Sequence, residues 1–463
     1  MELIYRNPNF RRFHRWINRY GKRANAGMIL LIVALVTMII ANSPLRFWYE
    51  SLWTIEITLG VPQFNILSHG GHNMTLLDFV NDTLMALFFF AVGLEIKREI
   101  LVGELSSFRQ VMLPFLAACG GMIFPVLFFF ITGKIQHFSP EELRGVAIPM
   151  ATDIAFSLGV LSLFGKRVPI ALKVFLLAFA IVDDIGGIII IASFYSDLST
   201  YSALYLGISL LVFGVLFLGN RLRVNSKGFY GVFGVIIWYL FLQAGIHPTI
   251  AGVLVAFTIP ARPYLNIKNY VSGLQRDIDL IKSTTTHSSR ATSDDILLSN
   301  IQINYLSRVE RASDRAISPL QDMEDNLGGI VNYFIMPLFA FANAGVVFNF
   351  SGGFEMFSGI TLSVLVGLLL GKSIGIFSFT WLAIKFRICR LPMGVTWRNL
   401  FGVCLLGGIG FTVALFLASL SYPVGSDYLN QAKLGIVLGS FLSGAIGYLY
   451  LNKVLPKNEK KKK

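Results

Sequence analysis

The chain has 463 residues, of which 54% are hydrophobic and only 14% are charged, and its mean hydropathy is +0.65. Soluble domains are about 25% charged, so this composition excludes an ordinary soluble protein. The net charge of +13 does not indicate nucleic-acid binding, because the basic residues lie between hydrophobic runs and at both chain ends, as orientation in a lipid bilayer requires. Three scattered cysteines offer neither a disulfide framework nor the spacing of metal ligands.

Apolar runs of about 20 residues, the length a helix needs to cross a bilayer, recur along the chain. A basic segment (1–26) comes first. Spans one to eight (27–261) follow, then a long connection (262–326), spans nine to twelve (327–451) and a basic tail (452–463). The twelve predicted spans lie near residues 27–43, 75–96, 110–133, 143–164, 169–195, 201–219, 228–244, 247–261, 327–348, 357–384, 399–421 and 429–451.

The basic residues predict the orientation. With the N-terminus inside, the inner segments hold 33 of the 39 Lys and Arg, and the outer segments hold four: Arg46, Lys134, Arg144 and Lys433. Cytoplasmic loops are enriched in Lys and Arg, so this asymmetry predicts an even number of spans with both termini cytoplasmic.

Two pieces outside the spans have their own patterns. Residues 53–61 alternate apolar and polar side chains, which predicts a strand and a small outer β-hairpin near residues 53–64. In the 262–326 connection, the Ser- and Thr-rich centre at 283–295 predicts disorder, and 296–312 is compatible with a surface helix. A function for this connection and a tolerated insertion both remain open.

Ionisable side chains inside the spans are the main functional signal, because each costs about 2.5–3.5 kcal/mol at a helix centre on insertion scales. Span two holds Asp82, span four Asp153, span five the adjacent Asp183 and Asp184, and span ten Lys372. Counted from the predicted cytoplasmic ends at about 1.5 Å per residue, these four helices carry their charges roughly 18–22 Å deep. A shared depth favours one functional site over charges that only hold helices together.

Adjacent carboxylates on a helix point about 100° apart, so Asp183 and Asp184 are expected to face different surroundings. One would face a water-filled cavity and the other a partner such as Lys372. Two neighbouring anions resist being charged at the same time. A pair that holds either a proton or a small hard cation suits exchange, and its oxygen ligands suit sodium or lithium.

Two spans carry helix-breaking residues at mid-membrane. Span four contains Ile148-Pro149-Met150-Ala151-Thr152-Asp153, and span eleven contains Leu406-Gly407-Gly408-Ile409-Gly410-Phe411-Thr412. Broken helices in corresponding halves predict a transporter with inverted repeats, whose unwound segments cross at the binding site. Asp153 and Lys372 would compensate the facing helix dipoles. Close packing through small residues is the alternative explanation for these glycines.

At these residues the sequence resembles the NhaA family of bacterial sodium/proton antiporters, over nearly the whole chain from Gly27 to Leu451. The most specific stretches are Asn81–Asp82, Val92–Glu99, Ala151–Phe156, Ala180–Asp184, Pro337–Gly345 and Gly408–Thr412. The resemblance implies electrogenic, pH-activated exchange of sodium or lithium for protons at Asp183 and Asp184, in the inner membrane, without a cofactor. It also implies that Lys372 pairs with Asp183 and that Thr152 and Asp153 serve the crossing, with Asp82 supporting the site.

The resemblance further implies a cytoplasmic pH-sensing cluster and a dimer. The matching positions for the cluster are Glu95, Arg98, Glu99 and Glu324, with His247 a weaker candidate; an ordinary positive-inside helix end is the alternative for the first three. The outer hairpin matches the element through which family members form homodimers. The connection at 262–326 is longer than in compact members and leads directly to Glu324, which leaves open a different form of pH activation here.

Other classes fit the residues less well. An intramembrane aspartyl protease needs one aspartate on each of two helices, but here the pair is consecutive and Gly-x-Gly-Asp is absent from the sequence. A sodium-coupled symporter of organic anions would need a buried arginine beside Lys372, and a channel would need a repeated filter. The sequence therefore predicts an all-α, twelve-helix secondary transporter rather than an enzyme.

Overall fold

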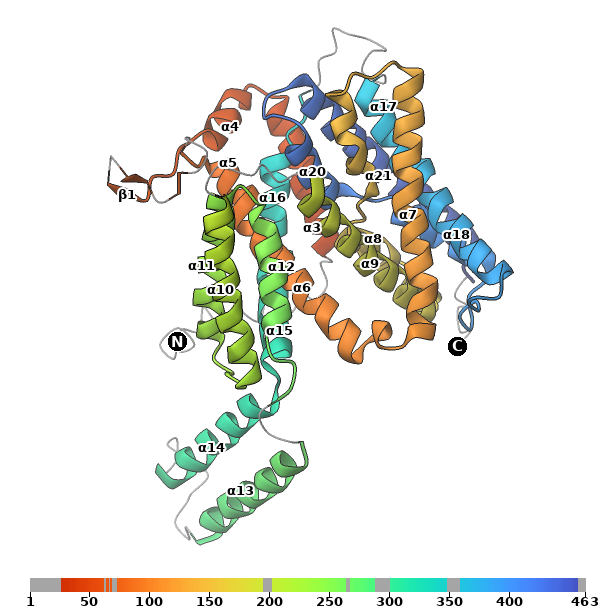
Figure 1. Cartoon of the computed structure of the whole chain (residues 1–463). Coiled ribbons are helices and arrows are strands. Elements are labelled where there is room, and N and C mark those ends of the chain that lie inside the picture. Colours follow the sequence, from red (N-terminus) through yellow and green to blue (C-terminus); the bar gives the residue numbers. More distant parts are fainter. Residues whose placement is uncertain are drawn as a thin grey trace.

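The computed structural model describes residues 26–61, 64–65, 67–68, 73–194, 202–263, 267–287, 300–347 and 359–456. Helices make up nearly all of this part of the chain, arranged as a bundle with a smaller helix pair below it (Figure 1). The basic segment before residue 26 and the end of the tail lie outside the described residues.

The first half of the chain alternates long helices with short irregular turns. Its elements are α3 (Ala26–Ala41), α4 (Arg46–Trp53), β1 (Gly60–Val61), β2 (Phe64–Asn65), α5 (Leu76–Asp78), η1 (Phe79–Leu84), α6 (Met85–Val102), η2 (Glu104–Ser106), α7 (Phe108–Ile135), η3 (Glu142–Met150), α8 (Ile154–Ser162), η4 (Gly165–Arg167), α9 (Ile170–Phe194), α10 (Ser202–Arg221), α11 (Lys227–Ala244) and α12 (Pro248–Thr258).

The second half begins with the long connection. Its elements are α13 (Ile267–His287), α14 (Asn300–Ala316), α15 (Pro319–Ile330), η5 (Val331–Ile335), α16 (Met336–Asn343), α17 (Gly359–Val366), η7 (Gly367–Lys372), α18 (Ser373–Lys385), α19 (Trp397–Gly407), α20 (Phe411–Ser421) and α21 (Asp427–Val454). Across both halves, three segments, η1, η5 and η7, are π-helical turns inside longer helices, a geometry that is frequent at functional sites.

Eight helices in the described ranges are long and apolar enough to cross a membrane, and two bent helix pairs raise the number to ten. The remaining two predicted spans do not form single helices that are long enough and apolar enough to cross a membrane. The helix predicted at 247–261 is only the 11-residue α12, too short to span alone, and the one at 327–348 continues α15 through η5 into α16. The chain is thus a multi-pass membrane protein, and twelve spans stay a prediction.

The strand predicted at 53–61 forms only in part. Trp53 ends helix α4, where its ring packs edge-on against Tyr49 and Phe341, and this packing favours the helix. Glu56 forms an isolated antiparallel bridge with Thr75, and regular pairing begins at Gly60: β1 pairs antiparallel with β2, Gly60 opposite Asn65 and Val61 opposite Phe64.

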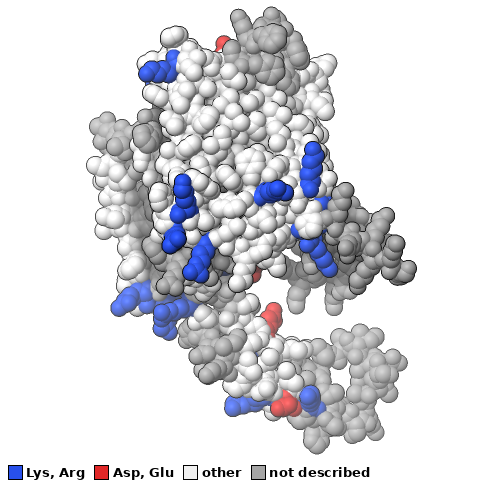
Figure 2. Space-filling view, turned by 90° about the vertical axis from the view of Figure 1, so that its right-hand side faces the viewer, with Lys and Arg blue, Asp and Glu red and all other residues white. Residues whose placement is uncertain are grey.

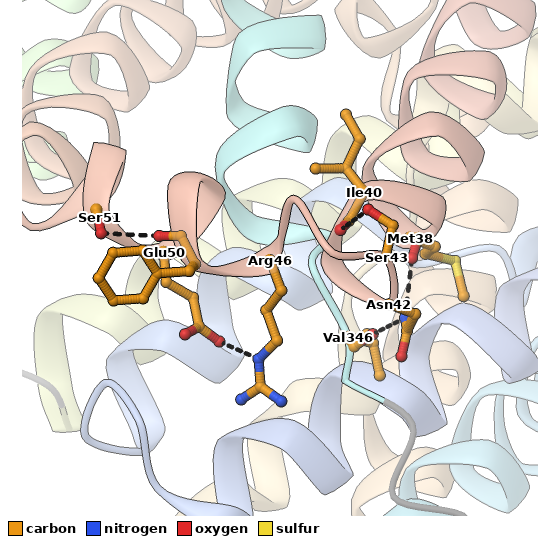
Figure 3. Close-up of polar contacts among 9 residues, drawn as sticks. Met38, Ile40, Asn42, Ser43, Arg46, Glu50, Ser51 and Val346 are labelled. Atoms are coloured by element: carbon orange, nitrogen blue, oxygen red, sulfur yellow. Dashed lines mark hydrogen bonds and ion pairs between the residues drawn. The ribbon is translucent and has the colours of Figure 1, made fainter.

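The junction between α3 and α4 bends the chain by 112°. Figure 3 shows how polar side chains fix the turn: Asn42 donates to Met38 O at 2.8 Å and to Val346 O at 2.7 Å, and Ser43 donates to Ile40 O at 2.8 Å. The bond to Val346 ties this turn to the chain just beyond α16.

Helices α7 and α18 make one of the closest backbone contacts in the bundle. A Cβ atom on Gly120 would collide with the carbonyl oxygen of Gly375, so only glycine allows the two backbones to approach this far. Small residues serve this purpose at helix interfaces in membranes. The contact fixes the helix that carries Lys372 against α7.

The charged residues are distributed unevenly. On the face formed by α7 and α18, Lys and Arg lie mainly in the lower half of the bundle, and few Asp or Glu are visible (Figure 2). Lys97 and Arg98 lie in the second half of α6, Lys166 and Arg167 make up most of η4, and Arg387 and Arg390 follow α18. The sequence predicts that these segments face the cytoplasm.

The connection predicted at 262–326 contains two paired helices. Tyr270 of α13 and Ser313 of α14 hydrogen-bond at 2.8 Å, and Leu320 N donates to Pro260 O at 3.2 Å where the connection rejoins the bundle. Residues 283–287 of the segment predicted to be disordered end α13, and 288–295 lie outside the described residues.

Candidate ion-binding site

Span four is broken where the sequence predicts a break. Helix η3 ends at Met150, residues Ala151 to Asp153 are extended, and α8 starts at Ile154, with a 42° bend between the two helices. Asp153 caps α8, because its Oδ1 accepts a hydrogen bond from Phe156 N at 2.9 Å. An aspartate at this position satisfies a free backbone donor and offsets the positive end of the helix dipole.

Span eleven is also interrupted, between α19 and α20, and its break lies against the first one. Asp153 N donates to Ile409 O at 2.7 Å, and Thr152 Oγ1 donates to Gly407 O at 3.1 Å. A Cβ atom on Gly410 would lie 2.7 Å from Ala151 O, so glycine permits this approach. The unwound backbone is buried in protein, the condition under which a membrane tolerates it.

Each helix end at the two breaks has a polar partner. The first turn of α20 donates to Asp153 Oδ2 through Thr412 N at 3.2 Å and Thr412 Oγ1 at 2.6 Å. At the negative end of the η3 dipole, the ammonium of Lys372 donates to Met150 O, the last carbonyl of η3. Asp153 therefore serves two helix N-termini, and Lys372 serves one C-terminus.

Lys372 also pairs with Asp183, as the resemblance implied. Its Nζ lies 2.6 Å from Asp183 Oδ2, and the exposed fractions of the two side chains are 0% and 1%. Lys372 ends the π-turn η7, and Asp183 lies in the middle of α9. A charged pair so far from water requires close geometry and further hydrogen bonds, and Met150 O supplies one of them.

Asp184 has different surroundings. No hydrogen bond or ion pair is made by its carboxylate to any described residue. It lines a cavity of about 450 Å³ together with Asp153, Thr152, Glu95 and Glu324. The two adjacent aspartates thus differ as predicted: Asp183 reaches a lysine, and Asp184 faces an open space.

Two of the predicted pH-sensing residues, Glu95 and Glu324, line this cavity, and Arg98 and Glu99 lie next to them. Arg98 contacts Glu99 and Glu324, each at 3.0 Å, and joins α6 to α15. Burial raises the pKa of Glu324, which precedes the predicted span, to about 7, although the Arg98 guanidinium acts in the opposite direction. A carboxyl group with this pKa changes its charge within the physiological pH range.

Two predicted residues lie elsewhere. His247 Nε2 is 3.7 Å from Asp82 Oδ1, and its Nδ1 is 2.8 Å from Thr249 Oγ1, so His247 belongs to a pair with Asp82 rather than to the cluster of Arg98. Asp82 lies in the π-turn η1, and its backbone carbonyl accepts a bond from Trp238 Nε1 at 3.2 Å. Neither residue is among those that line the cavity in front of Asp184.

Several partners that hold the site come from distant parts of the chain and were not predicted from the sequence. The hydroxyl of Thr412, the carbonyl of Met150 and the hydroxyl of Ser157, which donates to Leu406 O at 3.0 Å, all contact residues more than 200 positions away in the chain. Within the described ranges, no three His, Cys, Asp or Glu side chains are grouped to hold a metal ion.

Comparison with known proteins identifies the family. The family model described as Na+/H+ antiporter 1 matches residues 18–451. The chain is 55% identical over 435 residues to the Na(+)/H(+) antiporter NhaA of Phocaeicola vulgatus, covering 94% of both chains, and 53% identical to that of Bacteroides fragilis, covering 93% of this chain and 96% of the relative. This chain belongs to the Na+/H+ antiporter 1 family.

Members of this family are secondary transporters, not enzymes. The NhaA 1 antiporter of Saccharophagus degradans is 40% identical over 444 residues, covering 96% of this chain and 91% of the relative. Both helix breaks and the Asp183–Asp184 pair lie inside the matched range.

Proposed function

We propose that this protein is an electrogenic, pH-activated antiporter that expels sodium or lithium in exchange for external protons across the bacterial inner membrane. Family membership supports the sodium/proton exchange. The observation that carries the proposal for the site is the pair Asp183–Asp184, one carboxylate bound to Lys372 and its neighbour facing a cavity.

The two aspartates would hold either protons or one cation. Sodium enters from the predicted cytoplasmic side, where the cavity is lined by further carboxylates such as Glu95 and Asp325. Negative groups in a cleft raise the local concentration of cations. Sodium displaces protons from Asp184 and Asp183, the broken helices reorient, and external protons then displace the sodium. Competition at one site is what couples the two flows.

Other residues take supporting roles in this proposal. Thr152, Asp153 and Lys372 stabilise the crossing of the broken helices, and Asp82 supports it from its pair with His247. Arg98 and the surrounding Glu95, Glu99 and Glu324 form the pH-sensing cluster, with His247 outside it. Twelve spans with inverted repeats and cytoplasmic termini, and a homodimer formed through the outer hairpin, complete the proposed architecture.

The test is cation-induced dissipation of a respiration-generated pH gradient in everted vesicles, followed by acridine orange fluorescence between pH 6.5 and 8.5. Sodium and lithium should dissipate the gradient with the wild type and not with Asp184→Asn. Asp279→Asn, an exposed carboxylate on α13, serves as the matched control and should transport normally.

Two results would contradict the proposal. No response of correctly inserted wild type to either cation at any pH would exclude antiport and favour the symport of an organic anion. Transport by Asp184→Asn equal to that of the wild type would leave the antiport but remove Asp184 from the site.

A further inference from the structure

We infer that Thr412 is a positioning residue that keeps Asp153 bound to the broken helices, so that Asp184 rather than Asp153 meets the transported cation. The inference rests on the proposed antiport and adds a residue that sets how tightly the site binds its cation. Its starting point is that Asp153, Asp184 and Thr412 line the same cavity of about 450 Å³.

Both oxygens of Asp153 are engaged. Oδ1 accepts from Phe156 N at 2.9 Å, and Oδ2 accepts from Thr412 Oγ1 at 2.6 Å and from Thr412 N at 3.2 Å. The exposed fractions of Asp153 and Thr412 are 1% and 0%. A carboxylate that is buried and bound by three donors is already satisfied, so it gains little by turning towards a cation.

The hydroxyl of Thr412 is the strongest of these three contacts by geometry. Hydrogen bonds from a hydroxyl to a carboxylate at about 2.5–2.7 Å are roughly twice as strong as neutral ones. Threonine is branched at Cβ, which restricts its χ1 angle and fixes the direction of the hydroxyl. Without it, Oδ2 keeps only the longer bond to the backbone N–H, and a buried charge that lacks a donor turns to the nearest polar space.

That space is the cavity that Asp184 faces. A second carboxylate in the cavity would add attraction for sodium in the bound state, and the cation would leave more slowly. We therefore expect Thr412→Val to lower the KM for sodium at least threefold and to lower Vmax as well. A purely structural loss at the break would lower Vmax and the amount of folded protein but leave KM unchanged.

The experiment measures KM and Vmax for sodium at one fixed pH in proteoliposomes, normalised to inserted protein. Thr412→Ser restores a hydroxyl and should return KM towards the wild-type value. Thr380→Val is the matched control: Thr380 is equally buried, but its hydroxyl donates at 2.6 Å to Ile376 O of its own helix, far from any carboxylate bond. Its KM should match that of the wild type.

A double-mutant cycle shows whether the effect passes through Asp153. In an Asp153→Asn background, Thr412→Val should change KM by less than twofold. An unchanged KM in Thr412→Val, or the same large change with and without Asp153, would overturn the inference. If the wild type itself transports no sodium, the proposed function fails instead, and the two failures are thus distinguishable.

Discussion

The buried pair of Lys372 and Asp183 leads to a quantitative prediction for Lys372→Met. The substitution keeps the length of the side chain but removes the charge, leaving the carboxyl group of Asp183 without its cation beside Asp184, and Met150 O without its donor. Removing one partner of a buried ion pair costs about 3–5 kcal/mol, because the remaining charge is desolvated and unpaired. A loss of this size should lower the Tm of the purified protein in detergent by several degrees.

A double variant shows whether the loss of stability comes from the lost attraction or from the unpaired charge of Asp183. In Lys372→Met combined with Asp183→Asn, no charge of the pair remains buried, so most of the lost Tm should return. Lys453→Met, at an exposed lysine near the end of α21, should change stability by less than about 0.5 kcal/mol. The reasoning is refuted if Lys372→Met is as stable as the wild type, or if the double variant is as unstable as the single one.

Two further predictions concern α15 and the hairpin. Burial raises the pKa of Glu324 from 4.5 to about 7, so between these two pH values the folded protein binds more protons at this residue than the unfolded chain does. The contribution of Glu324 to the free energy of unfolding is therefore fully present below pH 4.5 and is lost as the pH rises through 7. Glu324→Gln should flatten the pH dependence of the stability of α15, measured by hydrogen exchange corrected for intrinsic rates. If the stability of α15 depends on pH as strongly in Glu324→Gln as in the wild type, Glu324 is not the titrating group. Replacing residues 59–68 by a Gly-Ser linker should convert the proposed dimer to a monomer in native mass spectrometry, and a surviving dimer would exclude the hairpin as its contact.

The features that could be predicted from sequence are local ones. Asp153, the Asp183–Asp184 pair and Lys372 stand out because a charge in an apolar run has a high cost, and both breaks stand out because proline and clustered glycine disrupt a helix. The pairing of Lys372 with Asp183 came from the resemblance and not from the spacing of the residues.

What failed depended on contacts between distant segments. Alternation at 53–61 predicted a strand, but packing of Trp53 against Phe341 of α16 keeps its first residue helical. His247 was grouped with Arg98 on the basis of family position, yet it lies beside Asp82. Thr412 belongs to one of the stretches that resemble the family, but its role could not be predicted, because it depends on a hydrogen bond to Asp153, 259 positions away in the chain.

The proposed cation site and the break in span four share one side chain. Lys372 donates both to Asp183, a member of the proposed ion-binding pair, and to Met150 O, the end of η3. When Asp183 takes up a proton its attraction for the ammonium falls, and Lys372 then has a stronger preference for the carbonyl and for the dipole of η3. When the proton leaves, the balance reverses. A change of ligand at the site therefore changes the force on the broken helix directly, which is what a transporter needs if binding is to select between two arrangements of the same helices.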